Sequence, residues 1–510
     1  MNYNTVTQKI GFCENIHEST AEQSLDADIN LPDYCPEIRK ILKCYVSPNI
    51  SSVSNNSGRI TADANVSVKI IYVGENGQIA CYEQNYPFQK YIESNSITSD
   101  SVVSVNIKTD YANCRAVNPR RIDVRAMMTF IFNVVKKAEE NIISSLEGSG
   151  IQTKTEELVV SSFCGSKERL FSLSEIVELE NDKAAVSQII NVAAIASINE
   201  TKVINNKVLI KGDCEIKIYY LSDNASSVEY IEHSIPISQI VELDGLNDNS
   251  KTSVILDVCS CEAVPKADSS GNMRLVDINI SVNASLTAFE ETPITLINDA
   301  YSTRYETKNK YGSSELLMFN DNFETVFTNK IILESIGVSV SRVNAVWCSE
   351  LKYNFSSKGN KCIISGTYLA NILYVDEENQ AGIIQKTVDY DFSVKLNEET
   401  DKIKCFGSVS AISCVCAVTG DSRLEMKTEL KASGIIYSET AKKHLSGIEI
   451  VTENKIKNNC ALTISFCDKD ENIWNIAKKY NSTVDIIKEE NGLNSDLLEN
   501  KCMLIIPSGI

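Results

Sequence analysis

The octapeptide Asn65-Val-Ser-Val-Lys-Ile-Ile-Tyr72 carries the clearest fold signal in the chain. Val66, Val68 and Ile70 alternate with polar residues, which gives an extended strand one apolar face and one polar face. Strands of this kind are typical of antiparallel sheets that cover a core on one side and meet water on the other. Gly74 and its acidic and amide neighbours follow directly and predict a turn.

The same strand-and-turn pattern occurs three times. A Cys-Ala-Val or Cys-x-Ala-Val motif follows the tyrosine of each copy after 42, 41 and 42 residues, and an arginine then opens a long alternating segment. Copies spaced by about 150 residues have the size of domains rather than of solenoid repeats. The tyrosines are Tyr72, Tyr220 and Tyr374, the cysteines Cys114, Cys261 and Cys416, and the arginines Arg121, Arg274 and Arg423.

We therefore predict a mainly β fold with three repeated antiparallel units, each a β-sandwich or barrel, and a small C-terminal module. Short helical turns are expected only around Ile38–Lys43 and Val186–Ile190. The polar segments 147–157 and 299–309 are predicted to join the units. The predicted boundaries are an N-terminal arm or edge strand at 1–30, repeats at 31–146, 158–298 and 310–437, a linker at 438–459 and the module at 460–510.

The last fifty residues predict the order strand, helix, helix, strand. Residues 462–466 alternate as a short strand does, and the apolar residues of 473–480 then recur at helical spacing. A second helical run, 484–491, ends in Asn491-Gly492, a pair that favours a helix C-terminus. Residues 504–506 form a closing apolar strand that stops at Pro507. The module is therefore expected to be a compact βααβ unit.

This order and its residues, above all Ile464, Phe466, 472–480 and 491–493, resemble a LysM domain. One position departs from the family pattern, because Asp470-Glu471 stands where LysM domains usually carry Gly-Asp. A loop glycine lets backbone amides approach a sugar closely, whereas aspartate adds bulk and charge. The departure argues against chitin or peptidoglycan binding and fits a protein partner that carries basic groups.

Small modules bind proteins through apolar anchors ringed by polar residues, and the LysM-like module has both kinds of residue. Its tryptophan, Trp474, has an alternative role as a core residue of so small a fold. The predicted partner-binding residues are Ile464, Phe466, Asp470, Glu471, Asn472, Trp474, Asn491 and Leu493.

The repeats have a resemblance of their own. Residues 31–38 (Leu-Pro-Asp-Tyr-Cys-Pro-Glu-Ile), 118–125 and 299–303 are similar to the SPOCS domain of endospore coat-associated proteins. Several SPOCS units followed by one LysM domain resemble the SipL family of clostridial spore coat morphogenetic proteins over nearly the whole chain.

The resemblance implies a non-enzymatic scaffold or adaptor in spore coat assembly. Its LysM domain would bind stage IV sporulation protein A, the ATPase of the coat basement layer, with other coat proteins as further candidates. The site of action would be the mother-cell cytosol, at the surface of the forespore and its coat. The alternative is a cell-wall protein that binds peptidoglycan or a chitin-type glycan.

Charge and cysteine usage agree with a cytosolic location. The formal net charge of −19 repels phosphate backbones, which argues against nucleic acid and anionic lipid as partners. The first ten residues lack the apolar core of a signal peptide, and no apolar run has the length of a membrane span. The 17 cysteines are scattered rather than framed as in small secreted scaffolds, so reduced thiols are expected.

Catalytic and metal-binding motifs are missing from the sequence. Its three histidines, His17, His233 and His444, lie in different segments without ligand-spaced cysteines or carboxylates, and no phosphate-binding or dinucleotide-binding glycine loop occurs. Two Cys-x-Cys pairs, 259–261 and 414–416, are candidate zinc ligands together with Cys405, but zinc needs four ligands and usually uses C-x₂₋₄-C knuckles on turns. We predict core packing for these cysteines, no cofactor, no metal and no enzymatic activity.

Overall fold

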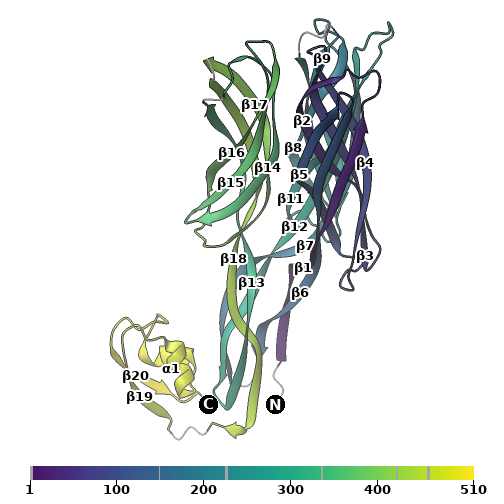
Figure 1. Cartoon of the computed structure of the whole chain (residues 1–510). Helices are drawn as coiled ribbons and strands as arrows, with labels where there is room; N and C mark the ends of the chain where they lie inside the picture. Colours follow the sequence, from purple (N-terminus) through teal and green to yellow (C-terminus); the bar gives the residue numbers. More distant parts are fainter. Residues whose placement is uncertain are drawn as a thin grey trace.

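The computed structural model of the chain describes residues 4–148, 150–223, 228–334, 337–420, 423–456 and 460–509. It consists of three six-stranded blocks of antiparallel sheet and a small C-terminal module with two helices (Figure 1). This confirms the predicted mainly β fold class.

Block 1 (residues 4–147) is built from two three-stranded sheets, β2-β3-β4 and β1-β6-β5, that face each other across one core. Its alternating strand β3 lies in the centre of its sheet and buries Val66, Val68 and Ile70 completely, as the alternation predicts. The strands are β1(Asn4–Asn30), β2(Ile38–Asn55), β3(Arg59–Gly74), β4(Ile79–Glu93), β5(Val102–Asn118) and β6(Arg121–Glu147).

Blocks 2 (151–302) and 3 (305–455) repeat this topology, with sheets ordered β8-β9-β10 and β7-β12-β11, then β14-β15-β16 and β13-β18-β17. The strands of block 2 are β7(Ile151–Glu178), β8(Val186–Ile204), β9(Lys207–Ser222), β10(Val228–Glu242), β11(Lys251–Lys266) and β12(Leu275–Ser302). Those of block 3 are β13(Tyr305–Leu333), β14(Val340–Lys358), β15(Lys361–Asp376), β16(Ala381–Lys395), β17(Ile403–Gly420) and β18(Arg423–Lys455).

The repeated tyrosine has a structural role in the first two blocks. The buried Tyr72 hydroxyl donates to the carbonyl oxygen of Pro36 at 3.0 Å, and the Tyr220 hydroxyl donates to that of Ala184 at 3.3 Å. Each bond ties the loop before the first strand of a sheet to that sheet's central strand. The tyrosine motif therefore closes equivalent corners of the two blocks.

The two predicted helical turns are wrong, because Ile38–Lys43 begins β2 and Val186–Ile190 begins β8. Both strand starts contain register shifts, between Ile38 and Lys40 in β2 and between Val186 and Gln188 in β8. A bulge adds one residue to a strand, so the spacing of inward side chains locally departs from two. The apolar residues at these strand starts therefore have a spacing close to that of a helix, which led to the wrong prediction.

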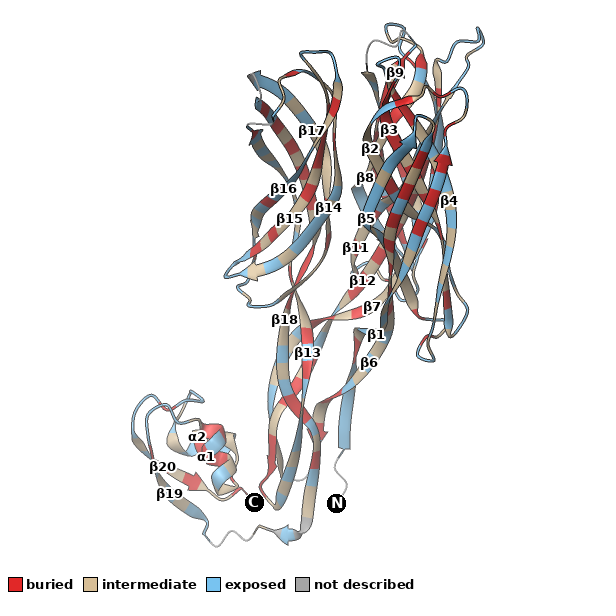
Figure 2. Cartoon of the chain, viewed as in Figure 1, coloured by how far each residue is buried: buried red, intermediate tan, exposed pale blue. Residues whose placement is uncertain are grey.

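Six long strands, β1, β6, β7, β12, β13 and β18, continue beyond the sandwiches and form a narrow stalk (Figure 1). Side chains of all three blocks meet inside it, so the buried residues continue from the sandwiches into the stalk (Figure 2). One stalk cluster contains Ile10, Ile142, Val160, Ile294, Leu296 and Leu316. Another contains Ile143, Leu146, Ile297, Ala300, Leu445 and Ile448.

The segments predicted to join the repeats are instead strands of the stalk. Residues 151–157 and 299–302 belong to β7 and β12, 305–309 belong to β13, and 438–455 of the predicted linker are the end of β18. Few apolar residues occur in each segment because the stalk core is shared among three blocks, so each strand contributes little of it. The N-terminal segment 4–30 is an edge strand, β1, paired along its length with β6. Residues 457–459 lie outside the described ranges.

At the opposite end from the stalk foot, the sheets β2-β3-β4, β8-β9-β10 and β14-β15-β16 pack against one another and form the head. β4 lies against β8, β10 against β14, and β16 against β2, so the contacts close a ring of three. The Tyr219 hydroxyl donates to the carbonyl oxygen of Val346 at 2.7 Å, and that of Tyr45 donates to Asn371 Oδ1 at 3.3 Å. The shared apolar cluster contains Ile71, Cys81, Ile190, Tyr219, Ala345, Trp347 and Leu373.

Candidate partner-binding site

The C-terminal module contains β19(Leu462–Cys467), α1(Ile473–Tyr480), α2(Val484–Asn491) and β20(Cys502–Pro507), with β19 and β20 paired antiparallel. The strand, helix, helix, strand order is therefore confirmed. Both helices start at a side-chain cap, since Asn472 accepts a hydrogen bond from the Trp474 amide and Thr483 accepts one from the Ile486 amide. Gly492 ends α2 in the left-handed conformation.

The sheet of the module has one buried and one exposed face. The alternate side chains Cys467, Leu504 and Ile506 point inward and are almost fully buried. The exposed fractions on the other face are 58% for Leu462, 61% for Ile464, 79% for Phe466 and 53% for Met503. We call this the outer face; it consists of Leu462, Ile464, Phe466, Met503 and Ile505.

Strand pairing makes the outer face continuous. Phe466 lies opposite Met503 and Ile464 lies opposite Ile505 in the β19–β20 register. Directly opposed side chains of an antiparallel pair lie close enough to touch. Contiguous apolar surface of this kind marks interaction sites more often than singly scattered residues do.

Two of the predicted partner-binding residues, Ile464 and Phe466, thus lie together on an exposed surface. Leu462, Met503 and Ile505 share that surface and are not among the residues predicted from the sequence. Alternation along β19 could have identified Leu462, because residues two apart on a strand share a face. Leu462 therefore lies on the same face as Ile464 and Phe466, and Thr463 and Ser465 lie on the other.

The acidic loop lies at one end of the module. Asp470 and Glu471 are exposed, and Asp470 takes a left-handed backbone conformation with φ 67°. Glycine adopts this region at little steric cost, and among other residues mainly asparagine and aspartate do so. The loop therefore keeps the backbone shape of a glycine position while carrying a carboxylate. The Asp470 amide donates to the carbonyl oxygen of Leu498 at 2.8 Å, which holds that shape.

Three of the predicted site residues contribute to the module's own structure. Asn472 caps α1, and Leu493 is half-buried against the core. Asn491 joins α2 to β20, because its Nδ2 donates to the carbonyl oxygens of Ile487 at 2.8 Å and Ile505 at 2.6 Å, and its Oδ1 accepts from the Ile505 amide. Their place in the module is therefore internal rather than on the outer face.

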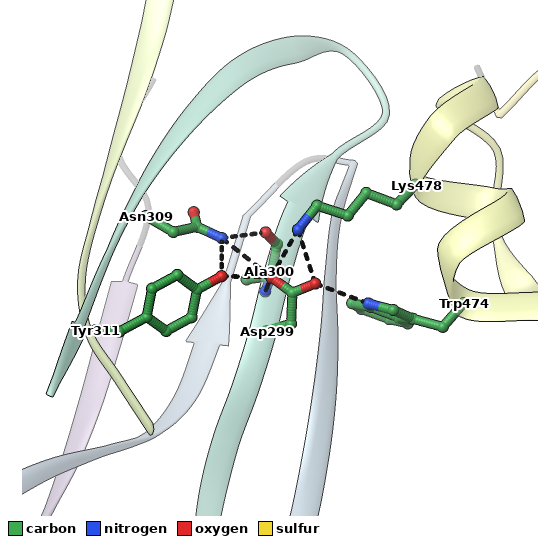
Figure 3. Close-up of polar contacts among 6 residues, drawn as sticks. All are labelled: Asp299, Ala300, Asn309, Tyr311, Trp474 and Lys478. Carbon is green, nitrogen blue, oxygen red and sulfur yellow. Dashed lines mark hydrogen bonds and ion pairs between the residues drawn. The ribbon is translucent and has the colours of Figure 1, made fainter. Parts of the chain in front are cut away.

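Trp474 contacts the stalk of its own chain and is only 9% exposed. Its indole Nε1–H donates to Asp299 Oδ2 at 2.9 Å (Figure 3). Its ring meets that of Tyr301 edge-on at a centroid distance of 5.0 Å. The Tyr301 hydroxyl donates to the carbonyl oxygen of Ser482 at 2.8 Å. We call these contacts, together with Lys478, the docking contact between module and stalk.

Asp299 is the polar centre of the docking contact. The Lys478 ammonium lies 2.7 Å from both carboxylate oxygens, and the Tyr311 hydroxyl donates to Oδ1 at 2.7 Å (Figure 3). Burial opposes ionisation of Asp299, but the hydrogen bonds from Lys478, Trp474 and Tyr311 outweigh it, and the pKa of Asp299 falls below its ordinary value. The carboxylate is thus ionised and satisfied at neutral pH.

The chain's histidines lie apart, each with local partners. His444 is buried in the stalk beside Ser314, at 2.9 Å, and Glu140, at 3.8 Å, while His233 lies 3.3 Å from Glu175 in block 2. His17 contacts Ser19 in β1. Among the described residues, no three cysteine, histidine or carboxylate side chains gather as a metal site would require.

α1 and α2 are eight residues long each. Within the described ranges, no helix has the length and apolar character needed to cross a bilayer.

Comparisons with protein families agree with these structural units. The SPOCS domain of the SipL family matches residues 37–117 and 185–264, and the LysM domain family matches residues 469–507. The SPOCS segments begin at β2 and β8 and end in β5 and β11, so they cover equivalent parts of blocks 1 and 2. No curated protein and no solved structure matches the chain. SPOCS domains and a LysM domain, both of a binding type, fit a sporulation-related protein.

Proposed function

We propose that this protein is a non-enzymatic scaffold in endospore coat assembly that binds another coat morphogenetic protein through the outer face of its LysM domain. The observation that carries the proposal is the row of apolar side chains on β19 and β20, four of them more than half exposed. Apolar anchors of this size, surrounded by polar groups, supply most of the affinity in small protein interfaces.

The surroundings of the outer face suit a protein partner. Asp468, Asp470 and Glu471 are exposed in the loop that follows β19, and Lys501 pairs with Asp468 at 2.8 Å. A mainly acidic rim steers an approaching basic surface and fixes its register. By the family resemblance, the partner is stage IV sporulation protein A, bound in the mother-cell cytosol at the forespore surface, and other coat proteins are further candidates.

The rest of the chain supports a scaffold role. Three blocks close a ring at the head. Their long strands extend as a stalk toward the LysM domain (Figure 1). A shared core in the stalk joins the three blocks, and the docking contact holds the LysM domain against the stalk. Such a molecule holds a partner at a set distance from whatever its head contacts.

The match to the LysM family favours one alternative, the binding of peptidoglycan or a chitin-type glycan. Two features of this chain speak against it. A carboxylate occupies the left-handed loop position at Asp470, and the indole N–H of Trp474 is already used by Asp299. We therefore place the glycan alternative second.

The test is co-purification of the full-length chain with stage IV sporulation protein A, using Ile464→Glu and Phe466→Glu. Each change places a charge at the centre of the outer face, and we expect at least a tenfold loss of binding, which corresponds to about 1.4 kcal/mol. Ile332→Glu, at a comparably exposed residue of β13, is the matched control and should bind normally.

Normal binding by both outer-face variants would overturn the proposal. Retention of the unaltered chain on purified peptidoglycan, lost in the same variants, would instead support the glycan alternative. Circular dichroism of each variant establishes that the LysM domain is folded.

A further inference from the structure

Two pairs of cysteines lie across equivalent seams of blocks 1 and 3. In every block, an edge strand of one sheet lies against an edge strand of the other: β2 against β5, β8 against β11, and β14 against β17. Cys44 on β2 and Cys114 on β5 both pack against the core of block 1, and Cys348 on β14 and Cys414 on β17 both pack against the core of block 3. The same seam therefore carries a thiol pair twice.

In block 3 the two sulfur atoms converge on one buried hydroxyl. Thr428 Oγ1 lies 4.0 Å from Cys348 Sγ and 3.8 Å from Cys414 Sγ, and Thr428 is itself fully buried. The Tyr368 hydroxyl donates to the same oxygen at 3.1 Å and fixes its position. The two thiols, contributed by different sheets, thus lie within 4.0 Å of the same buried oxygen atom.

The thiols of each pair also interact with each other, and unequally. A hydrogen bond from Cys414 lowers the pKa of Cys348, whereas the same bond and burial raise that of Cys414. In block 1, a hydrogen bond from Cys44 lowers the pKa of Cys114, and that of Cys44 rises. Each pair thus has one member that ionises more readily, and a thiolate is the form that attacks a disulfide.

Block 2 shows that the seam packs without such pairs. Its strand β11 carries Cys259 and Cys261, but β8 has no cysteine. Val192 of block 2 takes the place of Cys44, because each pairs with the equivalent isoleucine of the central strand, Ile218 or Ile70. Ala194 takes the place of Cys348 in the same way, opposite Ile216 where Cys348 lies opposite Ala370. Because valine and alanine fill these places in block 2, packing alone does not require cysteine there.

We propose that Cys44–Cys114 and Cys348–Cys414 are redox sites at which a small-molecule disulfide forms a covalent bridge between the two sheets of a block. The thiolate of Cys348 attacks one sulfur of the disulfide, whose S–S bond breaks, and the departing thiolate takes a proton from water. Cys414 then gives its proton to solvent and attacks the sulfur of Cys348, releasing the second small thiol. Two cysteines are oxidised, one small disulfide is reduced to two thiols, and block 1 reacts likewise through Cys114.

The test treats the reduced, full-length chain with glutathione disulfide, alkylates the remaining thiols and maps peptides without reduction. We expect two cross-linked peptides, Cys44 with Cys114 and Cys348 with Cys414, each lacking two hydrogen atoms. Cys259 and Cys261 should be alkylated. Cys460 is exposed and reports that the reagent has reacted. If Cys460 is fully glutathionylated while all four seam cysteines are alkylated, the proposal is overturned.

Serine variants test the pairing. In Cys414→Ser, the first step proceeds but the second does not, so Cys348 should retain glutathione and the cross-linked peptide should be absent. In Cys348→Ser, no cross-linked peptide that contains Cys414 should form. In block 1, Cys114 should retain glutathione in Cys44→Ser, and no cross-linked peptide that contains Cys44 should form in Cys114→Ser. Cys259→Ser is the matched control and should leave both bridges intact; loss of a bridge in this control would count against the assigned pairing.

Discussion

The indole N–H of Trp474 in the LysM domain donates to the carboxylate of Asp299 in the stalk at 2.9 Å, although 175 residues separate them in the chain. The sequence predicts Trp474 as a partner-binding residue with a core role as the alternative, and the structure places its side chain, 9% exposed, against the stalk of its own chain. The docking contact fixes how the LysM domain is oriented, so the outer face on β19 and β20 remains open to solvent.

Removing the carboxylate should loosen the docking contact. In Asp299→Ala, the indole N–H of Trp474 and the ammonium of Lys478 lose their shared acceptor, and a lost charge-assisted hydrogen bond weakens such a contact by about 1.5–3 kcal/mol. We expect red-shifted Trp474 fluorescence and stronger acrylamide quenching in a Trp347→Phe background, which removes the other tryptophan. Asp485→Ala, at an exposed aspartate of α2, is the control. Unchanged quenching in Asp299→Ala would show that Tyr301 alone holds the LysM domain.

The docking contact should also depend on pH. The pKa of Asp299 is lowered in the docked state by Lys478, Trp474 and Tyr311, so docking is supported fully above the ordinary pKa of 3.8 and is lost as the pH falls below it. Trp474 fluorescence should therefore change in an acid titration of the Trp347→Phe chain. Asp299→Asn removes this titration, and a transition of the same midpoint in that variant would assign it to another group.

The left-handed loop position gives a pair of opposite predictions. Asp470→Gly, at φ 67°, should stabilise the LysM domain by about 1 kcal/mol, because glycine avoids the steric penalty of this conformation. Gly492→Ala, at φ 64°, should destabilise it by a similar amount. Hydrogen exchange of LysM-domain amides measures both changes. Equal protection in Asp470→Gly would contradict the prediction and show that the aspartate side chain carries no steric penalty at this position.

The stalk should behave as a packed core rather than as linkers. Leu296 is fully buried among side chains of all three blocks, and Leu296→Ala should lower the free energy of unfolding by about 2–5 kcal/mol. Val159→Ala, at an exposed residue of β7, should change it by less than about 0.5 kcal/mol. Limited proteolysis gives a second readout, since 438–451 of the unaltered chain should resist cleavage and become susceptible in Leu296→Ala. Rapid cleavage there in the unaltered chain would contradict the paired stalk.

The sequence allowed the repeated strands and the LysM order to be predicted, because both depend on local periodicity. Val66, Val68 and Ile70 reveal their buried face within one short segment, and Ile473, Ile476 and Ala477 reveal theirs within another. The stalk was missed because its core is assembled from distant strands, as the meeting of Ile10, Ile294 and Leu316 shows. No local pattern contains that information.

The candidate site also contains residues that could be predicted from the sequence and residues that could not. Exposure of Ile464 and Phe466 follows from alternation within β19, so a strand assignment is sufficient to predict it. The burial of Trp474 depends on Asp299 and Tyr301, whose segment is polar and was predicted from the sequence to be a linker between repeats. Long-range partners of this kind become visible only when the chain is folded.

The ring at the head has a consequence for self-assembly. Its three contacts, β4 with β8, β10 with β14 and β16 with β2, are of the head-to-tail type that builds filaments when one end stays unoccupied. Here β16 of the third block contacts β2 of the first, so within the described residues each of these edge strands already has a partner. Growth into a polymer by adding further chains at the head would have to use a different surface.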